Sequence, residues 1–474
     1  MPAIQFPAST APGVNFTESG GRLINALCVD APPGSRSQLL WRRVAGLRPI
    51  ELTTGADDAR GNIKLGSQLV SVNGDTAYLT SKSGSVYSPA AQTGTVGGSG
   101  PVIMARNNRA TPQVFIVHSD GAQYLESGTV ADITDPDLPQ PVSVTTLDGF
   151  GVFAIADGRM FATALNDFTI DANDYTTAEA KPDGLVRAVA AGRDLLAFGN
   201  GSLEFYGNAG QETGFPFSRS AVIPVGLKGK YAVAGFDEGW TGPVGFVASD
   251  NTVRIISGYD AAVISNEDLQ KLIEAVTDTD DLRMTAYVSR GVAYLSLTYL
   301  EQWTWEFNTA RGRWHERQSY GRLDWRGQFA VNAFDEWLVS DDESADFFRL
   351  DSTFKREGVN QLIWEVRSIQ AHGFPGRAAV HRADFDFQTG VGVDIGADPI
   401  ETDPKVEVSW SDDGGVTFSA PELCRLGSQG ERLPVTVRRT GITSRNGRQW
   451  RLRVADPVDV ALYGGAMDAE ARAA

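Results

Sequence analysis

The sequence predicts a mainly β protein, in which a β-propeller is followed by a β-sandwich-like domain. Short apolar segments recur along the chain, and each meets a polar turn before apolar residues resume. These turns lie near positions 73, 120, 157, 200, 250, 290 and 341. A repeat of roughly 45 residues with several short strands in each unit is typical of a β-propeller. From position 362 the strands lengthen and the turns become less regular. We therefore predict a propeller of six to eight blades, with seven as the best estimate, and then a second β domain.

The clearest hairpin spans residues 245–256, where Phe246 and Val247 precede a turn and Val253 and Ile255 follow it. The turn contains Asp and Asn, which tolerate the left-handed backbone of tight hairpins. A single β-sandwich with many turns is the alternative interpretation. The recurrence of the hairpins favours the propeller.

The chain divides into three parts on this interpretation. Residues 1–60 contain strands near 24–29 and 39–44 but no hairpin of the recurring kind. We predict an arm that packs on the C-terminal domain, because an unpaired strand edge is costly. Residues 61–361 form the predicted propeller. Residues 362–474 form the C-terminal β domain, whose small, polar last stretch, 464–474, is expected to fray.

One helix is predicted within the propeller, as an insertion over residues 265–276. Ser265 is the expected N-cap, and Asp268 stands three residues later, as in a capping box. Apolar residues then follow with helical spacing: Leu269, Leu272, Ile273 and Val276. This apolar face is expected to cover one face of the propeller.

The charge of the chain is strongly negative, with a formal net charge of −17. Such a chain does not bind nucleic acid by general attraction, and a channel that it lines would repel DNA. Residues 250–281 hold eight acidic side chains, whereas residues 425–453 are rich in arginine. The arginines are Arg425, Arg432, Arg438, Arg439, Arg445, Arg448, Arg451 and Arg453. They indicate either solvated strand faces or a contact surface for an acidic neighbour, including another copy of the chain.

Neither a membrane segment nor a secretion signal is expected. No apolar stretch is long enough to cross a bilayer, and the first residues lack a basic patch followed by an apolar stretch. The two cysteines, Cys28 and Cys424, are expected to be separate thiols in a reducing cytoplasm. A disulfide between the chain ends is the alternative.

Catalytic, cofactor-binding and metal-binding motifs are not found, so no residue is assigned to such a site and no cofactor is predicted. The chain lacks the P-loop, the nucleophile elbow and the zinc-protease pattern, and its four histidines are far apart. Residues 411–418 fit the Asp-box pattern. Asp413 is expected to bind turn amides, Gly415 to supply the unusual φ, and Phe418 to insert into the core.

Five of the ten tryptophans lie within residues 299–337: Trp303, Trp305, Trp314, Trp325 and Trp337. Large aromatic residues in short β units usually belong to the core. An aromatic surface that binds sugars is the alternative. Together with the Asp box, it leaves open a glycan-active or glycan-binding propeller, such as a sialidase-like enzyme or an adhesin.

Several stretches together resemble one protein family, with the resemblance extending from about Phe153 to Pro457. They occur in this order: residues 199–205, 214–217, 304–307 with 312–317, 337–341 with 348–351, 389–392, 408–415 and 452–457. In this order they are similar to the packaged-DNA stabilisation proteins of short-tailed phages, which form the tail hub or nozzle. Each piece is short, so their order provides the specificity.

This resemblance implies a structural virion protein that is made in the cytoplasm of the bacterial host. It implies a homo-oligomer, a hexamer, below the portal and head-tail adaptor. Such a ring would close or extend the DNA channel, retain the packaged DNA without sequence-specific binding, and anchor the tail needle or tail fibres. It implies no enzymatic activity and no insertion into a membrane.

Overall fold

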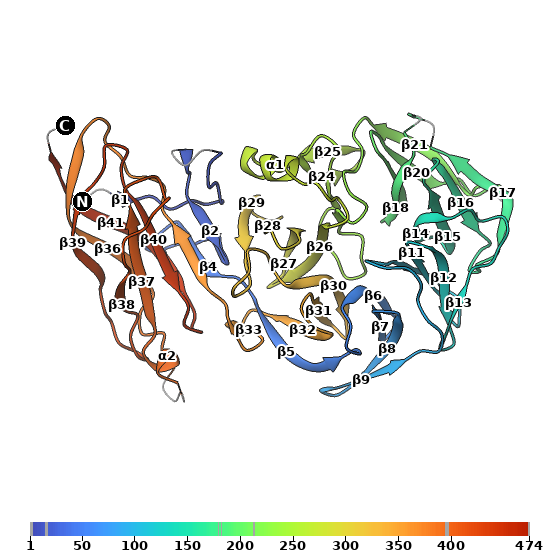
Figure 1. Ribbon diagram of the computed structural model, residues 1–474, viewed down its shortest axis with the longest axis horizontal. Helices are drawn as coiled ribbons and strands as arrows, with labels where there is room; N and C mark the ends of the chain where they lie inside the picture. Colours follow the sequence, from blue (N-terminus) through green and yellow to red (C-terminus); the bar gives the residue numbers. More distant parts are fainter. Residues whose placement is uncertain are drawn as a thin grey trace.

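The recurring hairpins of the sequence form four-stranded antiparallel sheets in the computed structural model (Figure 1). The structure describes residues 3–14, 18–178, 180–181, 183–211, 214–393 and 398–472. Five of its sheets each consist of four strands that are consecutive in the chain. The first blade contains β6 (Ala59–Leu65), β7 (Gln68–Asn73), β8 (Thr76–Ser83) and β9 (Val86–Ala91), and the second contains β10 (Ile103–Arg106), β11 (Val114–His118), β12 (Gly121–Glu126) and β13 (Thr129–Asp132). The third contains β14 (Pro141–Leu147), β15 (Phe150–Ile155), β16 (Arg159–Thr163) and β17 (Ile170–Thr177), and the fourth contains β18 (Leu185–Ala191), β19 (Asp194–Gly199), β20 (Leu203–Asn208) and β21 (Phe217–Ile223). The fifth contains β22 (Val233–Ala234), β23 (Gly245–Val247), β24 (Val253–Ser257) and β25 (Asp260–Val263).

Two further blades belong to larger sheets. The sixth blade contains β26 (Leu282–Ser289), β27 (Val292–Tyr299), β28 (Trp303–Asn308) and β29 (Arg313–Arg317). The seventh contains β30 (Gly327–Ala333), β31 (Glu336–Asp341) and β32 (Asp346–Asp351), and its fourth strand is β5 (Gly46–Thr53) from the other end of the chain. The described residues therefore form a propeller of seven blades, which confirms the predicted fold class and the best estimate of the blade number.

Strand β5 shows that residues 1–60 do not act as one arm on the C-terminal domain. It pairs with β32 and so closes the ring of blades. Gly46 begins this strand at a crowded point, because a Cβ there would lie 2.3 Å from the Phe354 carbonyl oxygen. A propeller whose last blade lacks a strand has an unpaired edge, and that edge attracts the nearest free strand.

The sandwich combines strands from both ends of the chain. One sheet has the order β3 (Ala26–Asp30), β4 (Leu39–Arg43), β41 (Ala461–Arg472), β36 (Arg377–Phe387) and β39 (Val435–Ile442), and β1 (Ala3–Ile4) also pairs with β41. The facing strands are β35 (Trp364–Arg367), β40 (Gln449–Val454), β37 (Lys405–Ser411) and β38 (Glu422–Arg425). Short elements complete the described chain: β33 (Arg356–Glu357), β34 (Asn360–Gln361) and α2 (Pro399–Thr402).

Strand β41 corrects the expectation that residues 464–474 fray. It is paired along most of its length with β36, so its small residues lie within a sheet. Residues 473 and 474 lie outside the described residues. Small side chains here have a structural use, because Gly465 lies close to Phe385 and Ile4.

A three-residue strand, β2 (Arg22–Ile24), joins the propeller to the sandwich. Ile24 pairs with Glu316 of β29, and Leu23 pairs with Val366 of β35. One continuous nine-stranded sheet thus extends from the sixth blade into the sandwich. The division into an arm (1–60), a propeller (61–361) and a C-terminal domain (362–474) remains a proposal. Strands β2, β3, β4 and β5 of the N-terminal segment belong to sheets of both the propeller and the sandwich.

The core consists of apolar clusters between neighbouring blades and one cluster inside the sandwich. The sandwich cluster includes Trp364, Trp450 and Phe385. In the propeller, Trp305, Trp314 and Trp325 are buried, which confirms the core interpretation for these three. Burial of such large side chains supplies much of the hydrophobic stabilisation of short strands.

Helix α1 (Glu267–Glu274) lies on the propeller, with Leu269 and Ile273 buried against the fifth and sixth blades. It is shorter than predicted, and its N-cap is Asn266, whose side chain accepts from the Leu269 amide. The assignment of Ser265 as the cap is wrong, because its hydroxyl accepts instead from the amide of Val253. The Ser265 hydroxyl is engaged by β24, so the neighbouring Asn266 provides the cap.

Cys28 and Cys424 are both free, as predicted. Among the described residues no helix is long and apolar enough to cross a membrane.

Candidate functional site

A buried ionic cluster lies where the sixth and seventh blades meet the connection to the sandwich. Oε1 of Glu306 lies 2.8 Å from Nε2 of His315, and the Tyr287 hydroxyl donates to Glu306 at 2.6 Å. Arg317 lies between two carboxylates, 3.5 Å from Glu306 and 3.4 Å from Glu357. All five side chains are almost completely enclosed. Sequence analysis missed this cluster.

The pKa values in this cluster follow from burial and from Arg317. Burial raises the pKa of Glu306, but Arg317 and His315 outweigh it and hold the pKa below its usual value. Burial raises the pKa of Glu357, and Arg317 offsets only part of that rise. Glu306 and Tyr287 also line a cavity of about 240 Å³. Because Arg317 forms ion pairs with both carboxylates, the cluster is suited to stabilising this junction.

The Asp box forms the predicted turn. Asp413 accepts hydrogen bonds from the amides of Val416 and Thr417, and Gly415 has a φ of 91°. These bonds, together with those from the Ser411 and Thr417 hydroxyls, lower the pKa of Asp413 to about 2. The expectation for Phe418 is wrong, because its ring does not enter the core. It lies 4.2 Å from the guanidinium of Arg451, in a cation–π contact.

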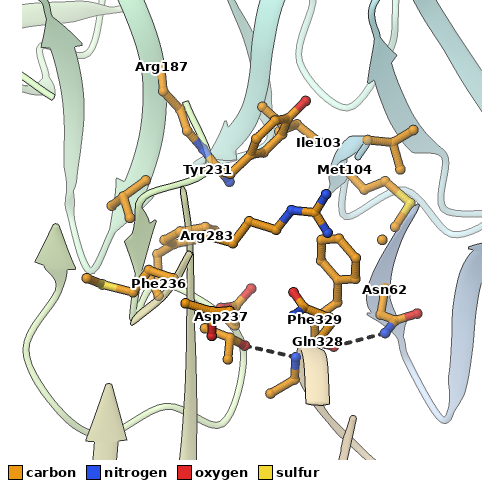
Figure 2. A pocket seen from close by; sticks show the side chains of 18 of the residues that line it. Asn62, Ile103, Met104, Arg187, Tyr231, Phe236, Asp237, Arg283, Gln328 and Phe329 are labelled. Carbon is orange, nitrogen blue, oxygen red and sulfur yellow. Dashed lines mark hydrogen bonds between the residues drawn. The ribbon is translucent and has the colours of Figure 1, made fainter. Parts of the chain in front are cut away.

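The first strands of the seven blades surround a central channel, and two adjoining cavities lie along it. The inner cavity has a volume of about 100 Å³. Figure 2 shows the side chains of Arg187 and Arg283 entering it from different strands, with Tyr231, Phe236 and Phe329 around them. The second cavity, about 210 Å³, shares part of this wall.

The inner cavity contains charged groups without close ion pairs. Burial lowers the pKa of Arg187 to about 10, and Asp237 offsets part of that effect. Burial raises the pKa of Asp237 to about 6, against the influence of Arg187. Burial also lowers the pKa of Arg283. These shifts show that the channel exposes charge to a poorly solvated space.

The Arg-rich stretch divides into two groups. Arg425, Arg448 and Arg453 form ion pairs within the chain, and Arg448 is 1% exposed and bonded to Asp412. Arg451 bonds to Ser409. Four others are exposed and have no hydrogen bond or ion pair within the described part of the chain: Arg432, Arg438, Arg439 and Arg445.

Two of these free arginines lie on the edge of a sheet. β39 ends the sheet order of the described strands and pairs there only with β36 (Figure 1). The register with β36 shifts beside Arg438, and Arg439 has a φ of 58°. This bulge lets two consecutive side chains, Arg438 and Arg439, both face solvent. Sequence showed the arginines, but the bulge that exposes them has no signal in composition.

Metal-binding geometry is absent among the described residues, where no group of three or more His, Cys, Asp or Glu side chains comes together. Of the four histidines, His315 is the one with a buried carboxylate partner.

Comparison with known proteins decides the family. A model described as bacteriophage P22 Gp10, β-propeller, matches residues 21–355, and a model described as bacteriophage P22 Gp10, β-sandwich, matches residues 371–470. The chain belongs to the P22 Gp10 family. It is a phage DNA-stabilisation protein, a structural protein of the virion tail, as the resemblance implied.

The P22 Gp10 models also agree with the observed architecture, since one covers the blades and the other the sandwich. Among curated proteins, none matches the chain. Solved structures that match the chain include the WD40 β-propeller domain of Doa1, with 10% identity and a TM-score of 0.41 over 64% of this chain and 96% of that one. They also include BBS1N in complex with ARL6DN, with 10% identity and a TM-score of 0.40 over 65% of this chain and 97% of that one. PorZ of Porphyromonas gingivalis matches with 10% identity and a TM-score of 0.38 over 70% of this chain and 44% of that one.

Proposed function

We propose that the chain assembles into a closed ring, a hexamer, below the portal and head-tail adaptor. The ring closes or extends the DNA channel, retains the packaged genome and anchors the tail needle or tail fibres. Membership of the P22 Gp10 family supports a tail protein, and the ring is the finer statement that we add.

The observation that carries the ring is the set of exposed arginines without partners in the described part of the sandwich, two of which lie on its edge strand β39. In a chain of net charge −17, a cluster of free guanidinium groups attracts the acidic surface of a neighbour. Closed rings need two different matching patches on each subunit. Arg438, Arg439 and Arg445 provide the basic patch.

The acidic patch is the second half of the match. It surrounds α1 on the propeller, and most of its carboxylates are exposed. The exposed acids are Asp250, Asp260, Glu267, Glu274, Asp278 and Asp280. Figure 1 places α1 on the side of the propeller next to the sandwich and β39 at the outer edge of the sandwich, so the two patches lie on different parts of the subunit. Other acidic side chains would line the DNA channel of the ring. They would let DNA slide, because adhesion to phosphate needs Lys and Arg.

The experiment replaces Arg438, Arg439 and Arg445 together with Ser. We expect tails that fail to assemble or particles that lose DNA, measured by electron microscopy and by the DNA content of particles. The matched control replaces three exposed propeller arginines, Arg109, Arg193 and Arg290, with Ser, which changes the charge by the same amount.

Normal tails and full DNA retention in the first variant contradict the interface. Equal defects in the control variant contradict it as well, since the effect would then follow net charge. A particle map that places Arg438 and Arg439 on the channel wall also overturns it.

We further propose that the chain acts without enzymatic activity. The buried position of Trp305, Trp314 and Trp325 and the pairing of Glu306 and Glu357 with Arg317 favour a structural role over glycan hydrolysis. Purified protein is expected to give no turnover of sialosides or capsular polysaccharide. Turnover that one carboxylate substitution abolishes would contradict this.

A further inference from the structure

The inner cavity of the propeller channel has polar atoms that lack hydrogen-bond partners within the described residues. They are the Nε atoms of Arg187 and Arg283, Nε2 of Gln328 and Oδ1 of Asn62. Gln328 is 4% exposed and Arg187 is 8% exposed, and both line the cavity. Three of the four atoms are donors. A buried donor without a partner costs free energy, so this wall lacks an acceptor.

The charge of the cavity is also incomplete. Arg283 has no carboxylate within ion-pair distance in the described chain, and its guanidinium carbon lies 5.6 Å from the centre of the Phe329 ring. Arg187 donates to the Lys230 carbonyl and lies over the ring of Phe236. Among the described residues, Asp237 is the one acidic residue that lines this space. Two guanidinium groups therefore face one carboxylate in a protein that is otherwise strongly acidic.

Size and chemistry limit the ligand. Water needs roughly 10–15 Å³ of such volume, so a cavity of about 100 Å³ holds several waters or one small ion. The donors suit a ligand that is negatively charged and offers acceptors in several directions. Arginine guanidinium groups bind tetrahedral oxyanions through such donors.

We propose that the centre of the propeller binds one inorganic tetrahedral oxyanion, phosphate or sulfate, between Arg187 and Arg283. Figure 2 shows the Arg283 guanidinium in the middle of the space, with the Arg187 side chain entering from another strand. Gln328 supplies a further donor from β30. The anion would thereby connect the inner strands β18, β26 and β30 and tie together blades that are distant in sequence.

The adjoining cavity offers the anion a route to the proposed site. Its wall includes Lys64 and Arg106, which form ion pairs with Glu238 at 2.9 Å and 3.0 Å. It also includes Arg187 and Asp237, so the two spaces meet at the proposed site. Asp237 opposes the anion, and its influence makes the site weaker than two arginines alone would make it.

The test is a calorimetric titration of the full-length chain with phosphate, and separately with sulfate, in chloride buffer at pH 7. We expect saturable binding of one anion for each chain. Arg283→Gln is expected to weaken the binding about tenfold or more, since a hydrogen bond to a charged group is lost. Asp237→Asn is expected to tighten it, because the opposing carboxylate is removed. Arg193→Gln, an exposed arginine on a propeller turn, serves as the control and is expected to bind as the wild type does.

Absence of saturable binding, with no rise of the unfolding temperature in phosphate over chloride of equal ionic strength, overturns the proposal and assigns the cavity to water. An equal loss in Arg193→Gln also overturns it, since the anion would then bind the surface. If Arg283→Gln does not fold, Asp237→Asn decides, because unchanged affinity in that variant contradicts a site beside Asp237.

Discussion

The propeller and the sandwich are both built of antiparallel strands, but they differ in where their strands come from. Five blades consist of four consecutive strands, whereas the sandwich sheet joins β3 and β4 to β41, more than 400 residues later. The propeller needs distant chain only at its closure, where β5 completes the seventh blade. Local hairpins therefore specify one region, and the meeting of chain ends specifies the other.

This difference suggests that the junction between the regions is the most sensitive part. Arg317→Met leaves Glu306 and Glu357 without their shared cation, and breaking a buried pair from one side costs about 3–5 kcal/mol. We expect a loss of that order in urea unfolding. Arg193→Met, on the surface, is expected to stay within about 0.5 kcal/mol of wild type. A loss for Arg317→Met no larger than the control's contradicts the stabilising role of the cluster.

The second prediction separates the two regions by their closing strands. Leu47 of β5 and Leu462 of β41 are both 0% exposed. Leu47→Ala and Leu462→Ala should each cost about 2–5 kcal/mol, because each leaves a cavity. Hydrogen exchange should show lost protection first in β32 for the former and in β36 for the latter. Identical patterns in the two variants would show that the regions unfold as one unit.

The third prediction concerns pH and the propeller channel. The pKa of Asp237 is raised to about 6, so the folded state holds the proton more tightly than the unfolded state. Stability from this group is therefore complete below about pH 4 and falls as pH rises to about 6. In chloride buffer at pH 7, Asp237→Asn should be more stable than wild type by on the order of 2 kcal/mol. The gain should vanish near pH 4, and a gain independent of pH contradicts the shift.

The smallest expected effect is at the helix on the propeller. Asn266→Ala removes the side chain that caps α1, which should cost about 1 kcal/mol in urea unfolding. Asn266→Asp keeps an acceptor at this position and is the control. Equal losses in both variants would show that the cap is not the cause.

The sequence predicted the propeller well because its hairpins are local. Six of the seven predicted turns join the second and third strands of a blade, but the turn near 290 joins the first and second strands of the sixth blade. The equivalent turn there contains Glu301, between β27 and β28. Glu301 and its neighbours contain no glycine, so nothing in the sequence marked this turn.

Other features depended on contacts that no local pattern records. Strand β5 carries the segment Leu47-Arg48-Pro49-Ile50, which resembles other short strands, and its partner lies about 300 residues away. The cluster of Glu306 and Arg317 lies on strands that the tryptophans of the sequence had drawn attention to. Which charged residues pair with one another became visible only in the folded structure. The free arginines were visible in the sequence, whereas the ones used internally, such as Arg448, could not be separated from them.

Strand β4 has a consequence for the order of events during synthesis. Trp41 pairs with Leu462, so its strand has no lasting partner on that side until the ribosome has made β41. At about 5–20 residues per second, the intervening chain takes roughly 20–80 s to appear. During that interval the blades can form one after another, while the first segment waits in an unfinished state. The sheet that contains β4 is therefore complete only after β41 has been made. A product truncated before β41 would expose an unpaired edge of β4, which the complete subunit does not.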